Sequence, residues 1–211
     1  MVRPMNHDLF EDARWVISAI ARGLNAIGGP AAELVLSRLA EQDLTMKDFV
    51  ERRPVSIDVT RFFAQAIAET MMHDSVVAAA LASLDGHLKW CQSSVYTDEI
   101  LGEGFLQNYG WCEIIGPKGF FKGDDFLLGI LMLGPNRHCK DHYHPAPELY
   151  WPLTGPTLWK QGQGEFELKQ AGEIIWHPAH VAHATKSNAR PLLAVWSWTR
   201  DTDTPARLVE A

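Results

Sequence analysis

The chain has 211 residues, enough for one large domain or two small ones with a buried core. Its formal net charge of −7 argues against a nucleic-acid partner, and no basic cluster opposes that interpretation. No apolar run approaches the roughly 18 residues that a membrane-spanning helix needs. The segment Met1 to Asp8 contains no apolar signal core, so we expect a cytoplasmic protein that binds neither nucleic acid nor membrane.

Residues 1–94 are predicted to form an α-helical N-terminal region. Apolar residues recur at steps of three and four, as on one face of an amphipathic helix, over 10–21, 30–41, 57–72 and 76–90. The Gly28-Gly29-Pro30 sequence predicts the end of the first helix and the start of the second. Asp74 stands where an N-cap of the last helix would be.

Residues 95–203 are predicted to form a mainly β domain. Short runs of β-type residues occur at 111–115, 126–133, 148–153, 173–176 and 192–198. Turn signals rich in glycine and proline separate them, which favours a sandwich or barrel of antiparallel strands. No long linker divides the two regions, so we expect the helices to pack on the barrel.

A cluster of metal-type ligands lies in the second region. His142, His144, Glu148 and His183 supply three imidazoles and a carboxylate, a complete ligand shell for a divalent transition metal. Alternate residues of a strand share a face, so His142 and His144 can point inward together. Glu148 and Tyr150 share a face for the same reason, and His183 would come from another strand.

These residues resemble the two cupin motifs. Gly134 followed by His142-x-His144-x3-Glu148-x6-Gly155 resembles the first motif, and Gly172-x5-Pro178-x-His180-x2-His183 resembles the second. The resemblance implies a C-terminal cupin β-barrel that binds one divalent metal through the three histidines and the glutamate. Zinc, iron, manganese, nickel and cobalt all accept such ligands, so the metal is not identified.

The local sequence is similar to that of the cupin-type dimethylsulfoniopropionate lyases of the DddQ and DddL groups. The similarity is carried by residues 144–155 and 191–198 and by the order of a helical half before a cupin half. It implies cleavage of a zwitterionic sulfonium substrate into dimethyl sulfide and acrylate, with Tyr150 as the catalytic tyrosine. Some relatives carry a second tyrosine shortly before the first ligand histidine, where this chain has Cys139, so the role of Cys139 stays open.

The reaction explains why such residues would be needed. It removes a weakly acidic proton next to a carboxylate and expels a neutral sulfide from the β carbon. A metal can stabilise the developing charge, and a phenol beside it can serve as the base. Aromatic faces hold a sulfonium cation, and the substrate-binding candidates are Tyr109, Trp111, Tyr143, Trp196, Trp198 and His180. Strict alternation makes Tyr143 face away from its histidine neighbours.

Two other functions use the same residues. An iron-dependent cupin dioxygenase would have the same ligands but would consume oxygen and would not need Tyr150. A non-catalytic small-ligand-binding cupin would neither consume oxygen nor need Tyr150. The sequence is compatible with a homodimer but sets neither the oligomeric state nor the exact physiological substrate.

Overall fold

The structure is a computed structural model that describes residues 6–209. Residues 1–5, which begin the predicted helical region and carry part of the localisation argument, lie outside the described residues. None of the helices within 6–209 combines the length and apolarity needed to cross a membrane.

The helices largely follow the sequence pattern. They are α1 (His7–Ile27), α2 (Pro30–Ala40), α3 (Phe63–Thr70), α4 (Ser75–Ser83) and α5 (Asp98–Leu101), with 3₁₀ turns η1 (Asp58–Phe62) and η2 (Leu106–Asn108). The first two helices and the Asp74 cap are confirmed, because the Asp74 carboxylate accepts hydrogen bonds from the backbone N–H groups of Val76 and Val77.

One predicted helix is wrong in its length. The last helix was expected to reach residue 90, but α4 ends at Ser83. Gly86 follows with a φ of +77°, a conformation that interrupts helices and that glycine adopts without strain. Leu88 and Trp90 are still buried, and they reach the core from an extended segment that bridges to Val55.

Within the described residues, ten strands form two antiparallel sheets. They are β1 (Tyr109–Ile115), β2 (Leu127–Leu133), β3 (His138–Tyr143), β4 (Glu148–Pro152), β5 (Thr157–Gln161), β6 (Glu167–Lys169), β7 (Ile175–His177), β8 (His183–Lys186), β9 (Leu192–Trp198) and β10 (Arg207–Leu208). The helix-side sheet has the order β1-β2-β9-β4-β7, and the outer sheet has the order β10-β3-β8-β5-β6. The five strands read from β-type runs are confirmed, whereas β5, β6 and β10 lack such runs and were not expected.

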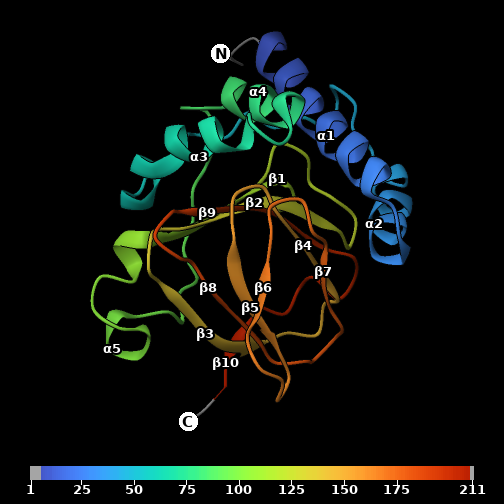
Figure 1. Ribbon diagram of the computed structural model, residues 1–211. Helices are drawn as coiled ribbons and strands as arrows, with labels where there is room; N and C mark the ends of the chain where they lie inside the picture. Colours follow the sequence, from blue (N-terminus) through green and yellow to red (C-terminus); the bar gives the residue numbers. More distant parts are fainter. Residues whose placement is uncertain (1–5, 210–211) are drawn as a thin grey trace.

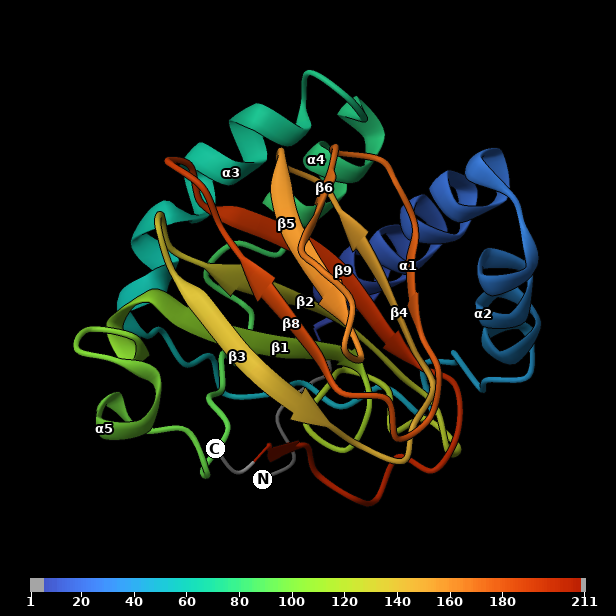
Figure 2. The same ribbon diagram turned by 60° about the horizontal axis from the view of Figure 1, so that its bottom comes forward.

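Alternation along the helix-side sheet separates two apolar cores. On β4, Leu149 and Trp151 belong to the core beneath the helices, whereas Tyr150 belongs to the core inside the barrel. On β9, Val195 and Trp196 divide in the same way. Helices α1 to α4 lie over one side of this sheet, and the outer sheet lies on the other (Figure 1, Figure 2). The predicted cupin-type barrel with a helical region packed on it is confirmed.

The division of the chain near residue 95 stays a prediction. Helical and β residues share the first core, and Phe49 bridges to Phe121 across the expected boundary. At the other end, β10 pairs with β3 beyond residue 203.

Leu128 on β2 is fully buried between the sheet and the helices, whereas Leu168 on β6 is 52% exposed. We expect Leu128→Ala to lower the free energy of unfolding by about 2–5 kcal/mol, because it leaves a cavity in a packed core. The same change at Leu168 should stay within about 0.5 kcal/mol of the parent. Urea denaturation of both variants checks this, and equal losses would contradict the assignment of the core.

Candidate active site

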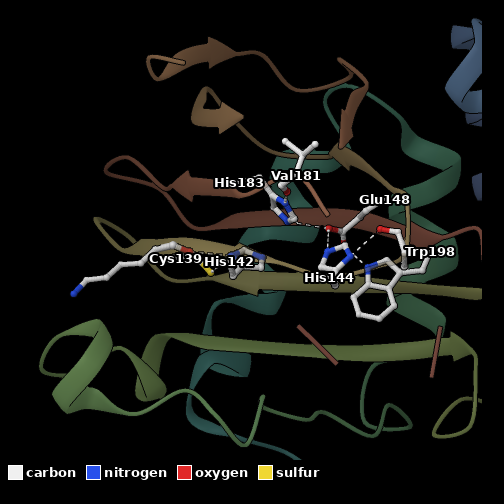
Figure 3. A network of polar contacts seen from close by, with 9 residues as sticks. Cys139, His142, His144, Glu148, Val181, His183 and Trp198 are labelled. Carbon is white, nitrogen blue, oxygen red and sulfur yellow. Dashed lines mark hydrogen bonds and ion pairs between the residues drawn. The ribbon is translucent and has the colours of Figure 1, made fainter. Parts of the chain in front are cut away.

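A β-bulge brings Cys139 and His142 to the same inner face of β3. Cys139 pairs with Thr185 and His142 pairs with His183 on β8, so three steps on one strand match two on the other. The extra residue of a bulge changes the alternation locally. Both side chains are therefore buried, and the Cys139 sulfur lies beside the His142 ring (Figure 3).

The three predicted ligand histidines are oriented by backbone carbonyls. The Nδ1 contacts are His142 to Lys140 O at 2.8 Å, His144 to Ala146 O at 2.8 Å, and His183 to Val181 O at 3.0 Å. A carbonyl oxygen can only accept, so Nδ1 carries the proton in each ring. In a neutral ring the lone pair is then on Nε2, which is the arrangement found in metal-binding histidines, whereas in a protonated ring Nε2 donates to a neighbouring carboxylate.

Two of these Nε2 atoms converge on the Glu148 carboxylate. Glu148 Oε2 lies 3.0 Å from His144 Nε2 and 3.2 Å from His183 Nε2. One donor atom from each residue lies within 4.8 Å of the other two. Within residues 6–209, the buried His183 Nε2 has no hydrogen-bond partner. Two imidazoles and a carboxylate in this arrangement fit a divalent transition metal.

His142 lies next to this set and is not a member of it. Its ring centroid is 4.2 Å from that of His183 and 6.3 Å from that of His144. Burial, followed by the charge on His183, lowers the pKa of His142 to about 3, so its imidazole is neutral at physiological pH. The structure thus brings all four predicted ligands together, with three in a compact group and the fourth beside them.

The Glu148 carboxylate is 2% exposed and remains ionised. Burial by itself raises the pKa of Glu148, but the opposing influence of His144 and His183 outweighs it and holds the pKa well below its usual value. The indole Nε1 of Trp198 donates to Oε1 at 2.8 Å (Figure 3). Both carboxylate oxygens are therefore held by neighbours.

The ligand group opens into a cavity of about 240 Å³. His142, His144 and Glu148 line it together with Tyr150. Its size is below the range of about 300–1,000 Å³ that is usual for drug-sized ligands, so it suits a smaller molecule.

Tyr150 is a buried phenol in the wall of this cavity. Its ring centroid lies 6.5 Å from that of His183 and 4.8 Å from that of Trp159. Burial, and then the charge of Glu148, raise the pKa of Tyr150 well above its usual value. The protein groups alone therefore keep this phenol protonated at neutral pH.

Most of the predicted substrate-binding aromatics reach the cavity, and two predicted residues do not. The predicted substrate-binding residues that line the cavity are Tyr109, Trp111, Trp196 and Trp198. Tyr143 follows the inward-facing His142 and so lies on the other face of β3, and it is absent from the cavity lining. His180 is exposed in a turn with a φ of +63°, and only its backbone N–H contacts the site, through His144 O at 2.8 Å.

Two buried residues that line the cavity, Tyr96 and Glu113, were not predicted to take part in the site, and a buried histidine, His177, packs against one of the predicted ligands. Tyr96 lines the cavity from a loop, with its ring centroid 6.2 Å from that of His142, and no sequence signal links that loop to the barrel. Glu113 also lines the cavity. It is two residues from Trp111 in a predicted strand, so alternation could have placed both side chains on the same face. The His177 ring stacks on the His183 ring, with a centroid distance of 4.1 Å and an interplanar angle of 9°, so it supports a predicted ligand from behind.

A model of the dimethylsulfoniopropionate lyase family matches residues 31–194 of the chain. The chain belongs to this family. The family resemblance read from the two motifs and their neighbouring sequence is thereby confirmed.

Relatives and solved structures of this family agree with that assignment. The chain is 27% identical over 109 residues to the dimethylsulfoniopropionate lyase DddQ of Ruegeria pomeroyi, an alignment covering 52% of this chain and 54% of that protein. It is 26% identical over 125 residues to the putative lyase DddL of Cereibacter sphaeroides, covering 58% and 50% of the two proteins. The chain thus spans about half the length of the curated relatives it matches.

Two crystal structures show the same fold. A structure from a study of the lyases RdDddP and RnDddQII matches with a TM-score of 0.64 and 22% identity, covering 92% of this chain and 99% of the other. Ruegeria pomeroyi DddQ matches with a TM-score of 0.63 and 19% identity, covering 89% and 96%. At these identities the likeness establishes the fold alone.

Metal binding should stabilise the folded chain, because the ligand group exists only in the native state. At a metal concentration 100 times the Kd, the expected gain is about 2.7 kcal/mol. His144→Ala should lose most of this gain, and His180→Ala, a change of the same kind at an exposed position, should keep it. Thermal melting with and without Zn²⁺ or Mn²⁺ measures the difference, and equal shifts for both variants would rule out the assigned site.

Proposed function

We propose that this protein is a metal-dependent lyase that cleaves dimethylsulfoniopropionate into dimethyl sulfide and acrylate. The observation that carries the proposal is the presence of Tyr150 in the wall of the same cavity as His144 and Glu148. Membership of the lyase family supports the substrate and the class of reaction. The cytoplasmic location and the homodimer remain predictions.

The proposed metal ligands are His144, Glu148 and His183, with His142 beside them as a fourth donor. Two observations support this set. The Nε2 atoms of His144 and His183 both approach Glu148 Oε2, and the Nδ1 atoms of both histidines are hydrogen-bonded to backbone carbonyls. A divalent ion bound there supplies Lewis-acid stabilisation of negative charge on a substrate carboxylate and lowers the pKa of a nearby phenol. The protein groups raise the pKa of Tyr150, so the proposed base forms only if a bound metal ion lowers that pKa again.

Tyr150 begins the proposed reaction as a phenolate. Its oxygen takes the proton from the carbon next to the substrate carboxylate and becomes a neutral phenol. The electron pair of the broken C–H bond forms the double bond of acrylate, and the bond from the β carbon to sulfur breaks with its electrons going to sulfur. The positive sulfonium becomes neutral dimethyl sulfide, and the negative charge of the phenolate is replaced by that of acrylate. Tyr150 then returns its proton to water, which restores the phenolate.

The aromatic lining suits the other end of this substrate. Trp111, Trp196 and Trp198 form successive edge-to-face pairs with centroid separations of 6.0 and 6.1 Å. A cation is attracted to such faces through the ring quadrupole, by about 0.5–2 kcal/mol. A narrow aromatic cavity also excludes water from the carbon that loses its proton.

Removing the phenolic oxygen tests the proposed base. We expect Tyr150→Phe to lower kcat for dimethylsulfoniopropionate by about 100-fold or more, the usual scale for a lost general base. Tyr143→Phe makes the same chemical change on the other face of β3 and should leave kcat within about twofold, because it removes no proton acceptor from the cavity. Headspace measurement of dimethyl sulfide from metal-loaded protein gives both values, and full turnover by Tyr150→Phe would refute the mechanism.

Oxygen dependence separates the lyase from a cupin dioxygenase. The elimination needs no oxidant, so the rate of dimethyl sulfide release should be the same in air and under anaerobic conditions. A rate that falls with oxygen removal, with oxygen consumed in step with substrate, would favour the dioxygenase. Absence of any turnover with full metal occupancy would favour the non-catalytic ligand-binding cupin.

A further inference from the structure

Glu113 is a buried carboxylate in the cavity wall to which the proposed reaction assigns no role. Tyr109, Trp111 and Glu113 alternate along β1, and all three line the cavity. Glu113 is 6% exposed. The backbone N–H of Lys118 donates to its Oε2 at 2.6 Å, and the residues that the structure describes provide no other hydrogen bond and no ion pair to this carboxylate.

The two carboxylates inside the cavity are in different electrostatic situations. Both oxygens of Glu148 are taken up by His144, His183 and Trp198. Glu113 has a single backbone N–H. Burial raises the pKa of its carboxyl group, and the charges of Lys118, Arg52 and Lys89 offset only part of that rise. A desolvated charge of this kind is stabilised by any cation that enters the cavity.

The sheet register aligns Glu113 with Tyr150. Glu113 pairs with Gly129, Gly129 with Trp196, and Trp196 with Tyr150, along one row across four strands. At ordinary strand spacing the two ends of this row are about 14 Å apart between backbones, and both side chains point inward. A Cβ on Gly129 would lie 2.9 Å from the Trp196 ring, so the indole covers the space between the two ends.

A cation already lies on this part of the wall. The Lys118 ammonium is 4.4 Å from the centroid of the Trp111 ring. Lys118 is exposed and can turn outward, whereas Trp111 and Glu113 belong to β1 and stay in place. Asp203, also exposed, is a third carboxylate in the cavity lining, after Glu113 and Glu148. Beside the Trp111 ring the cavity wall thus carries a fixed carboxylate, that of Glu113, and one displaceable ammonium, that of Lys118.

We propose that Glu113 and Trp111 form the site for the cationic head of an onium carboxylate, a zwitterion with a sulfonium or quaternary ammonium at one end. The carboxylate end lies toward Tyr150 and the His144–Glu148–His183 group, and the two methylene groups lie over Trp196. This orientation of the ligand rests on the proposed function. Glu113 is then a specificity-determining residue, because it distinguishes a cationic head from a neutral one of the same shape.

Two probes of equal shape test this assignment. 3-(Trimethylammonio)propanoate carries the positive charge, and 4,4-dimethylpentanoate replaces the nitrogen by carbon. We expect the metal-loaded wild-type protein to bind the cation about tenfold or more tightly than the neutral probe, because a charged partner faces it in a desolvated site. Calorimetry and quenching of tryptophan fluorescence report both affinities without any turnover.

Glu113→Gln keeps the shape of the side chain and removes its charge. It should reduce the preference for the cation to within about threefold of unity, while the affinity for the neutral probe stays the same. Glu167→Gln makes the same change of net charge at an exposed position on β6 and should leave the preference intact. An unchanged preference in Glu113→Gln would overturn the inference.

A second variant moves the affinity in the opposite direction, which a folding defect cannot imitate. Lys118→Met removes the ammonium that competes for the Trp111 face, so the cationic probe should bind more tightly by a few-fold. Weaker binding of the cation by this variant would contradict the assigned role of Lys118 and the site built on it.

Measuring both dimethyl sulfide release and the cation preference distinguishes a failure of the proposed function from a failure of this inference. Release of dimethyl sulfide together with an equal cation preference in wild type and Glu113→Gln would leave the lyase standing and remove the cation site. Absence of dimethyl sulfide, together with a preference lost in Glu113→Gln, would remove the lyase and leave a binding site for onium carboxylates.

Discussion

The buried charge of Glu148 is the constraint on which the rest of the site depends. A carboxylate with 2% exposure is costly unless charged or hydrogen-bonding partners surround it. Here His144 and His183 approach one oxygen, and the Trp198 indole donates to the other. These three contacts join β4, β8, β9 and the segment after β3, so the barrel must close correctly for the charge to be tolerated. The same closure aims the free imidazole nitrogens at one point.

The two-sided packing of the helix-side sheet explains how a small barrel can keep its interior open. Residues such as Leu149 and Trp151 face the helices and contribute to a large apolar core there. Stability therefore does not require every part of the barrel interior to be filled, so Tyr150 on the opposite face can belong to the inner apolar core and still line a cavity. The N-terminal helices thus serve the site indirectly, because the helices cover the sheet from which much of its wall is built.

Features that depend on local pattern and regular alternation could be predicted from the sequence. The spacing of His142 with His144, and of Glu148 with Tyr150, predicted inward-facing side chains, and the turn signals favoured a sandwich or barrel. Features that depend on local irregularity or on distant segments could not be predicted. The β3 bulge turns Cys139 inward against strict alternation, Tyr96 enters from a loop, and His180 turns outward in a left-handed conformation.

In the proposed site, one metal ion is held by His144, Glu148 and His183 beside Tyr150. Crystals of metal-loaded protein, with anomalous diffraction recorded on both sides of the metal's absorption edge, measure this directly. We expect a single peak bonded to the two Nε2 atoms and the carboxylate at about 2.0–2.2 Å. A fully loaded protein whose peak lies elsewhere, or whose His183 ring is turned away from the ion, would contradict it.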